Sequence, residues 1–406
     1  MLYFTTVYGN RCYFDRREIM NSPKFAILSV TILVYGLIAG CVELIKKKSN
    51  NSDKISSETI SLSSLEPFGQ AYELNRIQAI LYTDNLLWLG TPNGLYTFSY
   101  PSMKMEVLDD APYLKGENIV GLLSDSNGTI YANSKKTGLH ALPKGDTKFF
   151  STGSSRIRAM TLNPKGDAVY CATSHGIDIF ENNAWRNIKI KSLSKFTSQA
   201  NDVTSIAVDN KGNYWLGTTF GLYKMINENK FEFVFGDYQI VQSNMIIDER
   251  GNSPLGGNLL YSVTYSPKSN RLLLNSNGGL SIINGPENYK KKNAWINYTG
   301  DHTTSRMISG QIESVPVKGN SPLPNNFIKL SMEIGDSLFI GSDEGLATYE
   351  HNTKSWNLYN IDNQLSGDQI LSLYSLEKTE ENLLFVGTSG GLSIIKIISN
   401  HHKEES

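Results

Sequence analysis

Between about residue 70 and residue 397 the chain consists of short apolar runs separated by turns rich in glycine, asparagine, aspartate and serine. One stretch shows the unit well, with apolar runs at Val203–Val208, Tyr214–Thr218, Leu222–Ile226 and Lys230–Phe235 and a turn at Asp209–Asn213. Short runs of this kind, bounded by turn residues, are typical of strands joined in hairpins. The pattern therefore predicts a four-stranded antiparallel sheet.

This unit recurs seven times along the chain. In each copy the second strand ends with a small residue followed by Ser or Thr, and a glycine followed by Leu or Ile opens the third strand. Successive opening glycines are 38 to 66 residues apart by subtraction, and they are Gly94, Gly138, Gly176, Gly221, Gly279, Gly345 and Gly391. The shorter steps match the roughly 40–50 residues of a propeller blade.

Each recurring residue type has a physical reason. The glycine suits a backbone position with positive φ, and the hydroxyl before the turn can bond to turn amides. The small residue allows neighbouring blades to approach closely, and through the copies it is Gly90, Asn133, Ala172, Gly217, Asn275, Gly341 and Gly387. The sequence therefore predicts an all-β fold: a seven-bladed β-propeller of four-stranded antiparallel blades.

The repeats resemble the two-component-regulator propeller repeat, which occurs in the extracytoplasmic sensor part of hybrid sensor kinases. The resemblance rests most clearly on Leu323–Ile328, Ser337–Ser342 and Gly345–Tyr349, and it covers about residues 70 to 397. It implies a seven-bladed sensor-type propeller. No kinase pattern follows the seventh copy, so a sensory role implies a partner protein. The seventh copy has only three strands, and we expect Ile60–Phe68 to supply the fourth, because an open edge invites aggregation.

The N-terminal region predicts an exported lipoprotein. An apolar run, Phe25–Leu37, follows Lys24 and leads into Ile38-Ala39-Gly40-Cys41. Such a run followed by small residues is typical of a signal peptide, and the last four residues resemble the lipobox of bacterial lipoproteins, which implies a diacylglyceryl group on Cys41. The alternative is an uncleaved anchor, since the 21 residues of Phe25–Ile45 would suffice to cross a bilayer.

These patterns predict four regions. Residues 1–40 form the signal segment, whose true start is expected at Met20, and residues 41–60 form a flexible tether rich in Lys, Ser, Asn and Glu. Residues 61–398 form the propeller and residues 399–406 a polar tail. The expected location is extracytoplasmic, with the lipid of the cell membrane or the outer membrane as anchor.

Net charge, histidine spacing and motif context argue against nucleic-acid binding, metal binding and hydrolase chemistry. The formal net charge is −1, which gives no footprint for nucleic acid. None of the six histidines lies at metal-ligand spacing except the tail pair His401 and His402, which lacks a third ligand. The segment Gly387–Gly391 matches the nucleophile elbow of hydrolases, but it lies in a blade turn with no helix after it. We therefore expect no metal, no cofactor and no catalytic residue.

Two insertions interrupt the regular spacing, at residues 236–258 and 299–325. In a propeller the connections between blades and the turns between second and third strands emerge on one face. Long loops in a compact fold are often functional, so this face is the expected functional surface. The candidate ligand-binding residues are His175, Phe220, Tyr238, His302, Arg306 and Glu344.

Three functions remain open at this stage. The first is a non-catalytic surface lipoprotein that binds a ligand or partner, such as a glycan or a peptide, on this face. The second is a lyase for uronate polysaccharides or lactone antibiotics, in which His175 would act as base beside Arg306. The third is a structural role in envelope assembly. No repeated cluster of catalytic His or Tyr residues is present, which favours the first and third.

Overall fold

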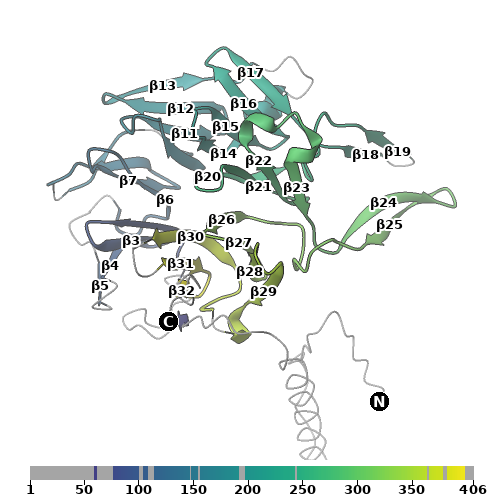
Figure 1. Cartoon of the computed structure of the whole chain (residues 1–406). Coiled ribbons are helices and arrows are strands. Elements are labelled where there is room, and N and C mark those ends of the chain that lie inside the picture. Colours follow the sequence, from purple (N-terminus) through teal and green to yellow (C-terminus); the bar gives the residue numbers. More distant parts are fainter. Residues whose placement is uncertain are drawn as a thin grey trace, which may run out of the picture. The chain divides into compact units, whose positions relative to one another are not determined.

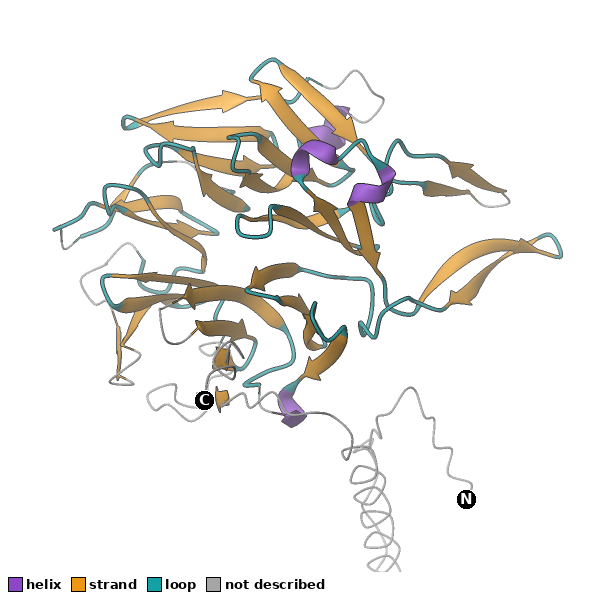
Figure 2. Ribbon diagram, viewed as in Figure 1, coloured by secondary structure: helices purple, strands orange, loops and turns teal. Residues whose placement is uncertain are grey.

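Seven four-stranded antiparallel sheets account for most of the structured chain. The computed structural model describes residues 59–61, 76–99, 104–107, 114–146, 148–153, 156–191, 197–242, 245–363, 365–377 and 382–397. The predicted signal segment, most of the tether, Cys41 and the polar tail lie outside these residues. The expected fold, an all-β propeller with seven blades, is confirmed (Figures 1 and 2).

The first four blades follow the chain in order. Blade one is β2 (Ala79–Thr83), β3 (Leu86–Thr91), β4 (Gly94–Ser99) and β5 (Lys104–Val107). Blade two is β6 (Ile119–Ser124), β7 (Ile130–Ser134), β8 (Gly138–Leu142) and β9 (Phe150–Ser151). Blade three is β10 (Ala159–Leu162), β11 (Val169–Thr173), β12 (Gly176–Glu181) and β13 (Ala184–Ile188). Blade four is β14 (Val203–Val208), β15 (Tyr214–Thr218), β16 (Leu222–Asn227) and β17 (Lys230–Val234).

The last three blades complete the ring. Blade five is β20 (Leu260–Ser266), β21 (Arg271–Ser276), β22 (Gly279–Asn284) and β23 (Trp295–Tyr298). Blade six is β26 (Leu330–Ile334), β27 (Ser337–Ser342), β28 (Gly345–Glu350) and β29 (Ser355–Tyr359). Blade seven is β30 (Ile370–Glu377), β31 (Asn382–Thr388), β32 (Gly391–Ile397) and β1 (Thr59–Ser61).

The described helices are short: α2 (Thr197–Ala200) and three 3₁₀ turns, η1 (Pro286–Asn288), η2 (Lys292–Ala294) and η3 (Ile361–Asn363). None of these described helices has the length and apolar character that a membrane span requires.

An N-terminal strand closes the ring. The first strands of consecutive blades are neighbours all the way round, from β2 through β6, β10, β14, β20 and β26 to β30, which in turn lies beside β2. Strand β1 pairs antiparallel with β32, so the seventh blade takes its outer strand from the other end of the chain, as expected. The strand is Thr59–Ser61, whereas Ile60–Phe68 was expected, and residues 62–68 lie outside the described part.

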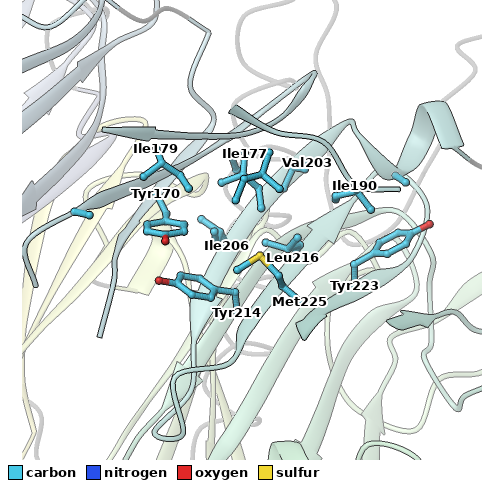
Figure 3. Close-up of a cluster of buried hydrophobic side chains, with 14 residues drawn as sticks. Tyr170, Ile177, Ile179, Ile190, Val203, Ile206, Tyr214, Leu216, Tyr223 and Met225 are labelled. Carbon is cyan, nitrogen blue, oxygen red and sulfur yellow. The ribbon is translucent and has the colours of Figure 1, made fainter. Parts of the chain in front are cut away.

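Apolar side chains fill the spaces between blades. The described residues form seven buried clusters, one at each junction between neighbouring blades. Figure 3 shows the cluster between blades three and four, where the rings of Tyr170 and Tyr214 stack with centroids 4.5 Å apart. Burial of apolar side chains between neighbouring blades is the main stabilising contribution in this all-β fold.

The recurring turn has the geometry that its residues predict. All seven opening glycines have positive φ, from 85° to 138°. In six blades the preceding hydroxyl donates to the carbonyl of that glycine and accepts from a turn amide, as Thr173 Oγ1 does with Gly176 O (2.9 Å) and His175 N (3.2 Å). In blade two the turn is one residue longer, and Ser134 donates instead to Glu117 (2.7 Å).

Candidate functional site

Both insertions fold as two-stranded hairpins. The first consists of β18 (Tyr238–Gln242) and β19 (Met245–Glu249), and the second of β24 (His302–Ile308) and β25 (Gln311–Val317). They extend from the same side of the ring, after blades four and five (Figures 1 and 2). They lie side by side, because Gln239 bonds to the Ser305 carbonyl and to the Thr304 hydroxyl, each at 3.4 Å.

A clasp of polar contacts closes the base of the first hairpin. Asp237 accepts a hydrogen bond from Gly251 N (2.7 Å), and the Asn258 side chain accepts one from Gly236 N (2.8 Å). Asn252 accepts from the amide of Phe235 (2.9 Å). The clasp holds the two ends of the insertion together, so the hairpin can extend without disturbing blade four.

The second hairpin is closed by the same contacts at equivalent residues. Asp301 accepts from Gly319 N (2.8 Å), Asn326 from Gly300 N (2.7 Å), and Asn320 from Thr299 N (2.8 Å). In each clasp a serine hydroxyl also donates to the backbone: Ser253 to Phe235 O (2.9 Å) and Ser321 to Thr299 O (2.8 Å). The two insertions therefore share one local structure on adjacent blades.

This equivalence is visible in the sequence once the two insertions are compared with each other. Both begin with Gly-Asp, at Gly236 and Gly300, and six of eight residues agree between 251–258 (GNSPLGGN) and 319–326 (GNSPLPNN). The second copy is longer, since the Asp-to-Gly contact spans 14 residues in the first and 18 in the second. A search for the blade repeat alone does not detect this second repeat.

A cavity of about 1040 Å³ lies where the two hairpins meet the blade turns. The turns of blades four and five provide one wall, and the hairpin bases and the connections to blades five and six provide the others. The lining residues are Thr219, Phe220, Asp237, Tyr238, Gln239, Asp248, Glu249, Arg250, Gly256, Gly257, Asn258, Leu259, Asn277, Gly278, Thr299, Asp301, His302, Thr303, Thr304, Asn325, Asn326 and Phe327.

The side chains of Phe220, Tyr238 and Phe327 line this cavity. Phe220 and Tyr238 meet edge to face with centroids 5.1 Å apart, and Phe235 supports both, at 6.4 Å and 6.5 Å. Phe327, which also lines the cavity, is 54% exposed. The cavity therefore offers rigid apolar faces surrounded by amides and hydroxyls, the mixture common in small-ligand sites.

The charge of the lining is acidic. Four carboxylates, Asp237, Asp248, Glu249 and Asp301, stand against one guanidinium, Arg250. Within the described residues no cluster of three or more His, Cys, Asp or Glu side chains has the arrangement that would hold a metal ion. The cavity therefore disfavours polyanions and favours neutral or cationic ligands.

The six candidate residues separate into three groups. Phe220, Tyr238 and His302 line the cavity. Glu344 is one residue removed from it, bonded to the lining residue Asn325 (3.0 Å). His175 lies in the turn of blade three, where its Nε2 is 3.3 Å from Asp178, and Arg306 lies on β24, opposite Glu313; neither lines the cavity.

Comparison with known proteins identifies the repeat. Residues 197–220, which span the start of blade four, match the family model of the two component regulator propeller. Residues 197–220 carry a two component regulator propeller repeat. No curated protein matches the chain.

Among solved structures, the extracellular domain of a B. thetaiotaomicron protein described as a hybrid two component system is 16% identical, with a TM-score of 0.57. The match covers 83% of this chain and 40% of that one, so this chain spans about two fifths of its length. Virginiamycin B lyase from Staphylococcus aureus is 11% identical with a TM-score of 0.50, and the match covers 84% of this chain and 99% of the lyase. At these identities the likeness establishes the propeller fold.

Proposed function

We propose that the protein is an extracytoplasmic, lipid-anchored propeller that binds a glycan in the cavity between its two hairpins, without catalysing a reaction on it. The observation that carries the proposal is the cavity itself. A propeller needs neither hairpin to close its ring, and ordering extra chain costs conformational entropy. Two extensions that jointly build one aromatic-lined cavity are therefore best explained by ligand binding.

The similarity to extracellular domains of two-component systems supports the extracytoplasmic part of the proposal. A sensory role would require the propeller to pass its ligand-bound state to a partner protein. The exposed hairpins are suited to such contacts, because they extend beyond the blades (Figure 2).

A lyase role receives less support. It needs a base and a charge-neutralising partner close together, and the expected pair, His175 and Arg306, belongs to blade three and to β24, outside the cavity. Within the described lining, His302 is the one imidazole, and its Nδ1 lies 3.1 Å from the Gly300 carbonyl. The likeness to virginiamycin B lyase is one of fold.

Lipid attachment gives the first testable prediction. In cells given labelled palmitate, the full chain should take up label and mature by loss of its first 40 residues, because Ile38-Ala39-Gly40-Cys41 presents small residues before a thiol. Cys41→Ala should leave an unlabelled precursor of higher mass. Equal labelling of the variant and the wild type would contradict the proposal.

Ligand binding gives the second prediction. The full chain, extracted in detergent, is applied to arrays of glycans and of peptides. We expect a class of glycans to bind, and Phe327→Ala to weaken that binding about tenfold, because the exposed ring supplies an apolar face in the cavity.

The matched control is Ile361→Ala, which removes another exposed apolar side chain (57% exposed) that does not line the cavity. It should bind like the wild type. Binding that survives Phe327→Ala unchanged, or an array on which nothing binds, would contradict the proposed function.

A further inference from the structure

The duplicated clasp has a consequence for the kind of ligand. We propose that the cavity is built from two equivalent half-sites, one per hairpin, and that it binds a linear oligosaccharide of neutral or amine-bearing sugars through two consecutive units. The inference rests on the proposed function and specifies the ligand of the same cavity.

Equivalent residues of the two hairpins line the cavity. The pairs at the starts of the two insertions, just after Gly236 and Gly300, are Asp237 with Asp301, Tyr238 with His302, and Gln239 with Thr303. The pairs at the closing ends are Gly257 with Asn325, Asn258 with Asn326, and Leu259 with Phe327. Each half-site therefore combines one ring from its hairpin base with the connection to the next blade.

Backbone groups hold both half-sites in the same orientation to their blades. The Asn258 carbonyl accepts from Gly221 N (2.6 Å), and the Asn326 carbonyl accepts from Gly279 N (2.9 Å). Because Gly221 and Gly279 are the opening glycines of blades four and five, each half-site is fixed to the same point of the repeat. The second half-site therefore occupies, on blade five, the position that the first half-site occupies on blade four.

A cavity with a repeated lining fits a ligand with a repeated unit. When two linked units occupy two half-sites, the second contact forms at the high effective concentration that the linkage provides. A single-unit ligand would use one copy only, and the other copy would add nothing. The repeat therefore argues for a polymer with a short repeating unit.

The lining favours sugars over peptides. Apart from Asn258 and Asn326, which hold the clasps, Asn and Thr side chains that both donate and accept recur around the cavity at Thr219, Asn277, Thr299, Thr303, Thr304 and Asn325. An extended peptide is usually bound by main-chain pairing at a strand edge. Beside the cavity the Ser305 carbonyl of β24 already accepts from Gln239, so this edge is partly occupied.

The charge of the cavity lining further restricts the class of sugar that can bind. With four carboxylates and one guanidinium in the lining, a uronate polymer would be repelled, whereas hydroxyl or ammonium groups would find acceptors. Asp237 and Asp301 occupy equivalent positions, so each unit of an amine-bearing polymer would meet a carboxylate.

The test measures affinity against ligand length by calorimetry on the detergent-extracted full chain. The probes are glucosamine and N-acetylglucosamine oligomers of one to four units, with galacturonate oligomers as acidic controls. We expect the affinity to rise at least tenfold from one unit to two or three, and the galacturonates to bind most weakly.

Half-site variants distinguish two subsites from one large site. Tyr238→Ala and His302→Ala should each bring the oligomer affinity close to that of the single sugar, while changing the single-sugar affinity about twofold or less. Arg306→Ala, an exposed change on β24 outside the lining, should leave all affinities unchanged.

Some outcomes would overturn the inference alone. If an array glycan binds and loses affinity in Phe327→Ala, but affinity is independent of length, the proposed function stands and the two half-sites do not. A galacturonate series that binds most tightly, or a peptide that binds while the sugar oligomers do not, would equally overturn the inference.

Discussion

Replacing Glu333 with glutamine is expected to lower the free energy of unfolding by about 3 kcal/mol. Glu333 is on β26 of blade six, and its side chain is only 3% exposed. It pairs with Arg271 of blade five (2.9 Å) and with His351 (3.4 Å), and accepts a hydrogen bond from Ser269. Glutamine keeps the shape but removes the charge, so it leaves the partly buried guanidinium uncompensated.

The effect should depend on pH. Burial acts to raise the pKa of Glu333, but hydrogen bonds from His351, Ser269 and Arg271 outweigh it and lower the pKa to about 2. Because the folded pKa lies below the ordinary value of 4.5, the stabilisation is present above about pH 4.5 and is lost as the pH falls toward 2.

Urea unfolding at several pH values measures this. The difference between wild type and Glu333→Gln should shrink by roughly half between pH 6 and pH 3. Glu313→Gln, an exposed change on β25, should stay within about 0.5 kcal/mol of wild type. A difference that is constant over this pH range would show that the Glu333 charge is not its source.

The regular part of the fold could be predicted from sequence because its determinants are local. The hydroxyl and the glycine of each turn lie within four residues of each other, and in six of the seven blades they bond to each other, as in Thr218 with Gly221 (2.8 Å). Each copy therefore marks its own position in a blade, and seven copies fix the number of blades. The closing strand had no such marker, and its position was predicted less well, at Ile60–Phe68 where Thr59–Ser61 pairs with β32.

The site could be predicted only in part, since it depends on which blades are neighbours. Phe220, Tyr238 and His302 belong to the two insertions or to the turn beside them, and they line one cavity. His175 belongs to a turn of the same type, but in blade three, whose turn does not line the cavity. Arg306 is in an insertion, but four residues along β24 from His302 and beyond the lining. The structure therefore brings three of the six candidates to one cavity and places these two elsewhere.

The clasp residues were missed because they look like ordinary loop residues one at a time. The structural role of Asp237 and Asn258 can be recognised only by comparison with Asp301 and Asn326, which make the same hydrogen bonds in the second insertion. A comparison of the two insertions with each other, in addition to the comparison between blades, reveals both the clasp and the pairing of the half-sites. In repeat proteins, irregular segments therefore merit the same search for repetition as regular ones.

Gly387→Ala is expected to destabilise the protein by about 3 kcal/mol, because it overpacks the junction that closes the ring. A Cβ at this position would lie well inside 3.0 Å of both the Ser372 hydroxyl and the Ile77 carbonyl. Those two groups are bonded to each other (3.0 Å) across blades seven and one, and Ile77 N donates to Thr388 O (3.1 Å). The added methyl would push the Ser372 hydroxyl away from the Ile77 carbonyl, so we expect the hydrogen bond between them to be lost as well.

The same blade position in other copies provides matched controls. At Gly90 a Cβ would meet Ile119 O at 2.8 Å, a milder overlap, so Gly90→Ala should cost less than Gly387→Ala. Ala172 already carries a methyl there and is fully buried, and Ala172→Gly should cost only about 1 kcal/mol. Denaturant unfolding of the three variants measures the order. Equal losses for the two glycine variants would mean that the ring relaxes at its closing junction, and that the close approach of blades seven and one does not limit stability.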